Sequence, residues 1–391
     1  MAECAKTPLT SAAFSENVAD DMSEKHSGDA AEKEFERLVE ADEKEFDAAA
    51  ERLVASRVPL MVKVLLVIGL AAAILLSFAI GQFPVTPFEL FEGIQRHFAG
   101  EVVTQQEVSV DKIIFSIRIP RILLVILVGA ALASAGAAFQ GMFRNPLVSP
   151  DLLGASAGAS LGACISLLLG FSVVATQIFA FLGGLLAVGL AMFLNRMVKY
   201  DRLLGLVLGG ILVSTLFQAG TSIVKLCADE NDTLPAITYW LMGSFSGANM
   251  DDLTIAVIPM LLGFVLLMIE RWKLNVLSLG EEEARSLGVN TRRTRFVVIA
   301  AATLLTSVSV AVSGVIGWIG LVIPHLARAI VGPNYRRLLP TSMLLGSVYL
   351  LLVDDVARCL LSMEIPIGIL TAVLGVPFFA IIFHHNAKGW S

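Results

Sequence analysis

The sequence predicts an all-α, polytopic membrane protein with about ten transmembrane helices, and three observations support this prediction. Of its 391 residues, 56% are hydrophobic and only 16% are charged, and the mean hydropathy is +0.78, beyond what the core of a soluble protein requires. Apolar stretches of about 20 residues, long enough to cross a bilayer, recur along the chain. Lysine and arginine gather in alternate connecting segments.

The apolar stretches follow a charged N-terminal segment and continue almost to the C-terminus. They lie at residues 60–80, 120–141, 151–170, 173–194, 203–226, 253–270, 296–313, 315–331, 341–361 and 367–385. Ten residues separate Gly136 from Pro146, and ten separate Gly314 from Pro324. This weak echo favours two oppositely oriented halves of five helices. The eighth stretch contains two glycines and Pro324, so we expect it to be broken or re-entrant.

Charge divides the chain into two predicted parts. Residues 1–58 hold 15 acidic and 7 basic residues, a net charge of −8, whereas the remainder carries +2. We predict an acidic cytoplasmic N-terminal extension at 1–58, partly disordered and partly helical, followed by a transmembrane domain at 59–391. With the N-terminus inside, the inner segments after the extension carry 13 lysines and arginines and the outer loops carry three. Both termini are therefore expected in the cytoplasm.

Two common signatures of catalysis and metal binding are missing from the sequence. There is no GxxxxGK phosphate loop and no HExxH zinc motif. The four cysteines lie far apart and the five histidines are scattered, which supports neither a disulfide framework nor a metal site. We expect no catalytic residue, no metal and no cofactor in this chain. If ATP drives the protein, ATP and Mg²⁺ bind to another chain.

Charged residues within or beside apolar spans are costly and therefore informative. Arg121 lies near the outer end of the second span, and Asp354 and Arg358 lie near the outer end of the ninth. Because Asp354 and Arg358 are four residues apart, an ion pair within one helix is as good an explanation as a functional role. The inner loop at 279–288 is predicted to form a short amphipathic helix bounded by glycines, which suits docking of a cytoplasmic partner.

Several longer motifs have a recognisable spacing. They are Arg118-Ile119-Pro120-Arg121, Gln140-Gly141 through Arg144-Asn145-Pro146-Leu147 to Ser149-Pro150-Asp151-Leu152-Leu153-Gly154, Tyr239-Trp240-Leu241-Met242-Gly243-Ser244, the loop from Leu279 to Gly288, Gly317 through Gly320-Leu321-Val322-Ile323-Pro324-His325 to Arg328, and Pro366-Ile367-Gly368. Over about residues 60–385, the chain resembles the FecCD family. These proteins are the permeases of type II ABC importers for ferric siderophores, haem, cobalamin and some oxyanions.

The resemblance implies a permease domain at 59–391 that acts in the bacterial plasma (inner) membrane as a homodimer or with a close paralogue. Two ATPase subunits would carry ATP and Mg²⁺ on the inner side, and an extracytoplasmic solute-binding protein would dock outside. Membrane lipid surrounds such a protein, and nothing implies a nucleic acid.

The resemblance also implies roles for individual residues. The docking residues for the binding protein would be Arg118, Arg121 and Arg358, as outward-facing basic pockets. The loop that couples to the ATPase would include Leu279, Gly280, Ala284, Leu287 and Gly288. The fifth and tenth spans would line the translocation path, with the segment 220–247 as an external gate. Polar residues chosen there by position are Thr215, Gln218, Ser222 and Thr371.

The leading hypothesis is therefore an ABC importer permease that translocates an iron chelate into the cytoplasm, with no catalytic activity of its own. A ferric siderophore is favoured over haem and cobalamin, because iron chelates are the commonest cargo of the family. An ion-coupled secondary transporter that acts alone is the alternative, but it would need acidic residues at mid-membrane, and the acids here lie near the ends of spans. A receptor or scaffold that uses the acidic extension is a third.

Overall fold

The computed structural model describes residues 60–81, 88, 91, 92, 95, 96, 111–197, 202–361 and 363–387. The predicted N-terminal extension lies outside this part of the chain and stays a prediction. Residues Leu60–Phe379 form one compact unit. The other unit comprises Met1–Pro59 and Ala380–Ser391. Of that second unit, only 380–387, the end of one helix, belong to the described residues.

Helices account for the regular secondary structure of the described residues, which confirms the all-α prediction. The apolar helices match the ten predicted spans: α3 (Leu60–Ala79), α6 (Ile119–Phe143), α7 (Ala155–Leu168), α8 (Val173–Asn195), α9 (Arg202–Cys227), α11 (Met250–Leu279), α13 (Thr291–Ser313), α14 (Ile319–Val331), α15 (Tyr335–Cys359) and α16 (Ile367–Ala387). Six of them are long and apolar enough to cross a membrane, and the others, α3, α7, α14 and α16, contain shorter apolar helices. The described residues also form four shorter elements: the π-helical η1 (Ile113–Arg118), the 3₁₀ turn η2 (Pro150–Leu153), α10 (Thr233–Met242) and α12 (Glu281–Ser286).

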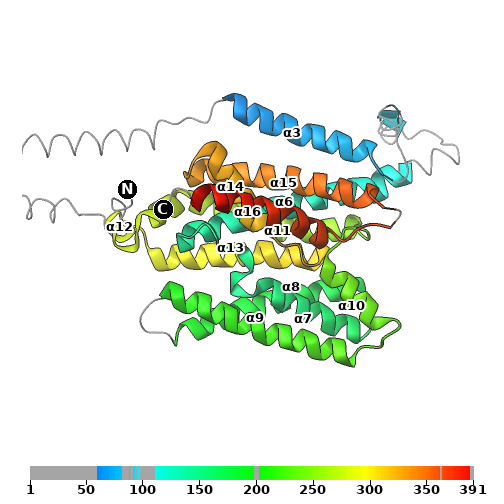
Figure 1. Ribbon diagram of the computed structural model, residues 1–391, viewed down its shortest axis with the longest axis horizontal. Coiled ribbons are helices and arrows are strands. Elements are labelled where there is room, and N and C mark those ends of the chain that lie inside the picture. The colour runs from blue at the N-terminus through cyan, green and yellow to red at the C-terminus, as the bar shows by residue number, and fades with distance from the viewer. Residues whose placement is uncertain are drawn as a thin grey trace, which may run out of the picture. The chain divides into compact units, whose positions relative to one another are not determined.

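Helix α6 is the centre of the unit. Every residue from Val128 to Met142 is buried, and α6 packs against α11, α13, α14 and α15 (Figure 1). Glycines allow the backbones to approach, as at Gly129 against Gly346 of α15. A side chain at Gly136 would overlap the backbone of Gly320 in α14. Close contact through small residues suits helices in lipid, where no hydrophobic force drives association.

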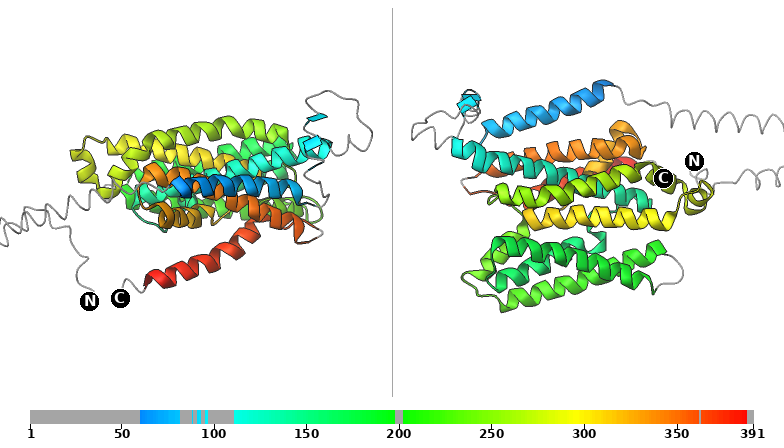
Figure 2. Two further views of the ribbon diagram at one scale, coloured as in Figure 1. Left: turned by 90° about the horizontal axis from the view of Figure 1, so that it is seen from above. Right: turned by 180° about the vertical axis from the view of Figure 1, so that it is seen from behind.

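Helices α7, α8 and α9 form a second group, joined to the first through α13 (Figure 2, right). Gly158 of α7 and Gly183 of α8 lie against each other's backbone. Large apolar side chains on α8, α9 and α11 point outward, among them Ile178, Leu182, Leu212, Leu216 and Ile258. An outer face of this kind is stable in contact with acyl chains.

The eighth predicted span is broken, as expected from its glycines and proline. Gly314 and Trp318 have φ angles of 68° and 70°, and α14 begins only at Ile319. Its 13 residues rise about 20 Å, less than the roughly 30 Å of a bilayer core. The side chain of Gln140 donates to the Leu321 carbonyl at 3.3 Å and so satisfies an acceptor within this segment. Irregular backbone of this kind persists at membrane depth where protein or a cavity surrounds it.

Candidate functional site

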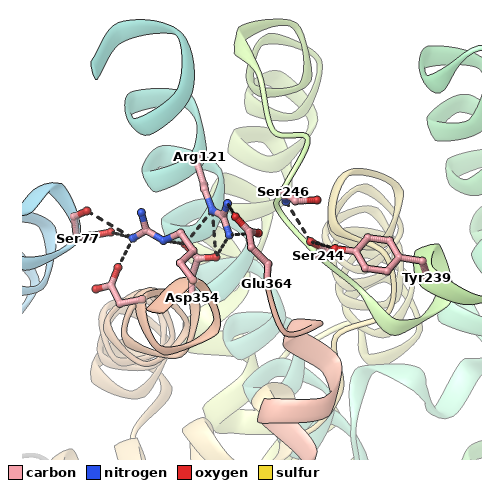
Figure 3. A network of polar contacts seen from close by, with 9 residues as sticks. Ser77, Arg121, Tyr239, Ser244, Ser246, Asp354 and Glu364 are labelled. Atoms are coloured by element: carbon pink, nitrogen blue, oxygen red, sulfur yellow. Dashed lines mark hydrogen bonds and ion pairs between the residues drawn. The ribbon is translucent and has the colours of Figure 1, made fainter. Parts of the chain in front are cut away.

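A network of charged side chains lies at one end of the helix bundle (Figure 3). Arg121, at the start of α6, lies between two carboxylates. Its Nη2 is 2.8 Å from Asp354 Oδ1, and its Nη1 is 2.8 Å from Glu364 Oε1 in the turn before α16. The fork of the guanidinium matches the geometry of carboxylates, so both contacts are strong charge-assisted hydrogen bonds.

Arg358, on α15, continues the network towards α3. Its Nε lies 3.2 Å from Asp354 Oδ2, and its Nη2 donates to Ser77 Oγ at 2.7 Å and to Asp355. The helical pair predicted between Asp354 and Arg358 is therefore present. We call Ser77, Arg121, Asp354, Asp355, Arg358 and Glu364 the ion-pair network.

Arg118 lies beside this network. Its Nη1 donates to the Phe78 carbonyl, and a side chain at Gly81 would meet the guanidinium groups of both Arg118 and Arg358. The structure therefore brings the three predicted docking arginines together. The side chains of Arg121 and Arg358 are only 7% and 8% exposed, because carboxylates of their own chain cover them. The arginines are thus not open basic pockets here, and their docking role stays a prediction.

The predicted coupling loop lies at the opposite end of the bundle, around α12 (Figure 1). Gly280 and Gly288 have φ angles of 150° and 77° and bound the short helix, as the sequence indicated. Ala284 is fully buried and belongs to a cluster with Val276, Leu277 and Val289. In contrast, Leu279 and Leu287 are 60% and 57% exposed. The loop therefore has one anchored face and one apolar face that is free to meet a partner.

Ion pairs hold α12 to the following helix. Glu281 contacts Arg295 of α13 at 2.8 Å and Arg285 at 2.6 Å. Burial alone would raise the pKa of Glu281, but the attraction and hydrogen bonds of Arg295, followed by those of Arg285, outweigh it and hold this pKa below its usual range. The carboxylate is therefore charged at neutral pH and fixes the orientation of the loop.

A polar pocket of about 370 Å³ opens between α7, α9 and η2 within the apolar bundle. Its lining residues include Asp151, Ser156, Ser160, Ser214, Gln218, Thr221 and Ser222. Such a concentration of hydroxyl, amide and carboxyl groups is expensive among membrane helices and marks a functional site. Gln218 and Ser222 were predicted to line the path; Asp151 and the serines of α7 were not assigned a role.

The turn before α7 positions the carboxyl group of the pocket. Asp151 lies in η2, which ends at Gly154 with a φ of 82°, and it accepts a hydrogen bond from Ser156. A side chain at Gly154 would lie 2.9 Å from Ser214 Oγ, so glycine lets α9 approach. Residues 154–158 also have the Gly-x-Ser-x-Gly spacing of hydrolases. That motif needs a strand before the serine, and here a 3₁₀ turn precedes it.

Two other predicted path residues lie outside this pocket. Thr215 is exposed on α9, and its hydroxyl donates to the Ile211 carbonyl at 2.9 Å. Thr371 of α16 is fully buried, and its hydroxyl donates to the Gly368 carbonyl at 3.1 Å. The prediction placed Thr371 on the path by position alone. In this conformation its hydroxyl is instead satisfied within its own helix.

Metal binding has no support in the part of the chain that the structure describes, where no group of three or more histidine, cysteine, aspartate and glutamate side chains could hold an ion. The polar groups of the pocket can instead form hydrogen bonds to a passing solute. An all-α membrane bundle with a polar pocket favours a transport protein.

Comparison with known proteins identifies which kind. The model of the FecCD transport family matches residues 69–385, and the chain belongs to this family. It is therefore a multi-pass ABC transporter permease, a class of subunit that is not itself catalytic.

Relatives with different named cargoes are similar to this chain. The molybdate import system permease protein of Haemophilus influenzae is 42% identical, over 71% of this chain and 83% of the relative. The hemin transport system permease protein of Yersinia pestis is 39% identical, over 68% and 80%. A solved structure described as an inward-facing metal-chelate type ABC transporter is 38% identical with a TM-score of 0.74, and covers 82% of this chain and 97% of that one.

Proposed function

We propose that this chain is the permease subunit of an ABC importer that passes a metal chelate, foremost a ferric siderophore, into the cytoplasm of a bacterium. Haem and cobalamin are the other chelates of this class. ATP hydrolysis takes place on two partner subunits, an extracytoplasmic binding protein delivers the cargo, and a second permease copy completes the path. The chain lies in the plasma membrane with both termini in the cytoplasm, and it binds no cofactor of its own.

This proposal is based mainly on the polar pocket. Gln218 and Ser222 line it from α9, and Asp151 and Ser156 line it from the turn and helix that face α9. Side chains with both donors and acceptors can replace part of the hydration of a polar solute as it passes. The pocket is open at α9, where Gln218 and Ser222 are exposed, so a solute can reach it.

The chemistry of the pocket favours a chelate over a free oxyanion. Asp151 is the ionisable side chain among the described residues that line it, and none of those residues is lysine or arginine. In its charged form this carboxylate repels an anion such as molybdate. A neutral or cationic complex with hydroxyl or amide groups at its surface finds suitable partners there.

Reconstitution tests the proposal directly. The chain would be co-expressed with its ATPase and binding protein, placed in liposomes, and assayed for ATP-dependent uptake of a ferric siderophore. Uptake should require all three proteins. It should fall at least tenfold in Asp151→Asn with Gln218→Ala, since two polar contacts of roughly 1 kcal/mol each are lost. Thr254→Val, which removes a hydroxyl that is bonded within α11 and lies outside the pocket, is the control and should keep normal uptake.

Each unfavourable outcome has a distinct meaning. Uptake by the chain alone, without ATP, would overturn the permease assignment and support an ion-coupled transporter. If ATPase activity remains intact without siderophore uptake, haem and cobalamin become the cargoes to test. Equal losses in the pocket variant and in Thr254→Val would show that the pocket is not the path.

Docking of the binding protein can be tested at the ion-pair network. Glu364 is 24% exposed and covers the guanidinium of Arg121, so it competes with any acidic side chain of a partner. Glu364→Gln should therefore tighten docking several-fold, and Asp232→Asn, an exposed acid in the loop before α10, should have a smaller effect. Weaker docking in Glu364→Gln would argue against Arg121 as a docking residue.

A further inference from the structure

Two cavities outside the polar pocket adjoin each other at α8. The first, of about 330 Å³, lies between α8, α10, the start of α11 and the end of α13, and we call it the aromatic cavity after Phe171, Tyr239 and Trp240 in its wall. The second, of about 280 Å³, lies between α8, α11 and α13, and we call it the apolar groove. The cavities share the lining residues Gln177, Ala311 and Val312, so one molecule can occupy both.

The apolar groove opens on the outer face of the helices. Apart from Gln177, its described lining residues are apolar. Val174, Ile178 and Ile255 at its edges are 45%, 50% and 45% exposed. In a membrane protein, apolar side chains on such a face meet acyl chains. The groove therefore suits one chain of a lipid.

The aromatic cavity contains a buried carboxylate that lacks a basic neighbour. Asp252 is 6% exposed, and no lysine or arginine is present among the described residues that line the cavity. Its Oδ2 accepts from the Asn249 backbone nitrogen at 3.1 Å, and its Oδ1 accepts from Gln177 Nε2 at 2.5 Å. Asp252 is the N3 residue of a capping box with Asn249 at the start of α11, and its oxygens can each accept a further hydrogen bond from a positively charged ligand in the cavity.

Gln177 supplies a second, independent sign of a ligand. Its side chain is more than nine-tenths buried, and its Oε1 has no hydrogen-bond partner. A carboxylate only accepts hydrogen bonds, so the amide nitrogen must face Asp252 and the oxygen must remain free. The cavity thus presents two acceptors, one of them charged, to a ligand that carries several N–H donors.

Hydroxyl groups occupy another part of the same wall. The Tyr239 hydroxyl lies 3.5 Å from Ser244 Oγ, which also accepts from the Ser246 backbone nitrogen at 3.0 Å (Figure 3). Tyrosine and serine hydroxyls can rotate to donate to a phosphate oxygen. The cavity therefore offers partners for both charges of a zwitterionic headgroup.

From this geometry we infer that the aromatic cavity and the apolar groove together bind a phospholipid with a primary ammonium headgroup. The ammonium donates to Asp252 and Gln177, the phosphate accepts from the hydroxyls of Tyr239 and Ser244, and one acyl chain fills the groove. A choline headgroup has no N–H to donate, and a glycerol headgroup leaves the lipid anionic and repelled by Asp252.

Native mass spectrometry of the delipidated full-length protein tests this inference. Phosphatidylethanolamine, phosphatidylcholine and phosphatidylglycerol with identical acyl chains would be titrated in turn. The ethanolamine lipid should bind about tenfold more tightly than the other two, the size of one charge-assisted hydrogen bond. Glycerophosphoethanolamine, which has the headgroup without acyl chains, should bind far more weakly.

Variants locate the site. Asp252→Asn should reduce binding of the ethanolamine lipid to the level of the choline lipid, whereas Asp251→Asn, which removes an exposed charge from the same helical turn, should not. Val312→Phe should block the junction of the two cavities and weaken binding while Asp252 is intact, so the test survives if Asp252→Asn fails to fold. Equal affinity for the three lipids, an unchanged preference in Asp252→Asn, or equal binding of the headgroup alone would overturn the inference.

Discussion

Substitution of Asp354 by asparagine should destabilise the folded protein more than any other single change in the ion-pair network. The Asp354 side chain is fully buried and contacts two guanidinium groups, at 2.8 Å for Arg121 and 3.2 Å for Arg358. An amide can keep one hydrogen bond but carries no charge. The substitution therefore leaves two nearby arginines short of one countercharge in a buried site.

The magnitude follows from what remains of the network. Breaking a buried ion pair by removing one partner typically costs 3–5 kcal/mol. Arg121 keeps Glu364, and Arg358 keeps Asp355 and Ser77, so we expect the lower end, about 3 kcal/mol. This change lowers the folding equilibrium constant roughly 150-fold.

Unfolding of the purified chain in mixed micelles, followed by circular dichroism during an SDS titration, measures this change. Glu364→Gln is the internal comparison, because Glu364 is 24% exposed and its removal should cost about 1 kcal/mol or less. A loss below about 0.5 kcal/mol in Asp354→Asn would refute the argument, because it would mean that water already solvates the arginines.

Three further predictions concern the α12 loop and the packing of α6. The pKa of Glu281 is held below the ordinary value of 4.5, so the stability that this carboxylate contributes is complete above that pH and is lost as the pH falls through the folded value. The protection of the α12 amides against hydrogen exchange, relative to their intrinsic rates at the same pH, should therefore fall there and also in Glu281→Gln at pH 7. Leu279→Ala and Leu287→Ala should change the unfolding free energy by less than about 0.5 kcal/mol yet weaken the stimulation of ATP hydrolysis by the permease, and normal stimulation would argue against a coupling role. Gly136→Val should prevent α6 from approaching α14 and abolish folded protein in size-exclusion chromatography, since its side chain would overlap backbone that cannot move away.

The fold could be predicted almost completely from the sequence, because the thickness of the bilayer sets the length of each apolar stretch. The structural helices begin and end within a few residues of most predicted spans. Two departures stand out. Helix α11 continues to Leu279, nine residues past its predicted end at 270. Helix α14 starts at Ile319 after left-handed backbone at Gly314 and Trp318. The glycines and the proline indicated a break there. They did not indicate where the helix would begin, since that depends on packing against α6.

The sites could be predicted only in part. The pair of Asp354 and Arg358 is local, and four-residue spacing was enough to suggest it. Ser77 and Glu364 join the network through tertiary packing of α3 and of the turn before α16, which no local pattern encodes. Asp151 lay within a recognised motif. Its approach to α9 depends on two close backbone contacts, of Gly154 with Ser214 of α9 and of Gly210 in α9 with Leu152 of η2, which no local pattern encodes.

The broken backbone before α14 gives the separate cavities a common wall. Ser313 and Gly314 line the aromatic cavity, and Val315, the next residue, lines the polar pocket. The Ser313 carbonyl also accepts from the Ser244 nitrogen at 2.8 Å, which ties this wall to the segment that follows α10. Irregular backbone at membrane depth is stable only where its polar groups are satisfied or face a cavity, and here both conditions hold. A movement of these few residues would change the shape of both cavities at once. A molecule that binds the aromatic cavity more tightly in one conformation must then shift the polar pocket towards that conformation, and a solute in the pocket must affect the cavity equally.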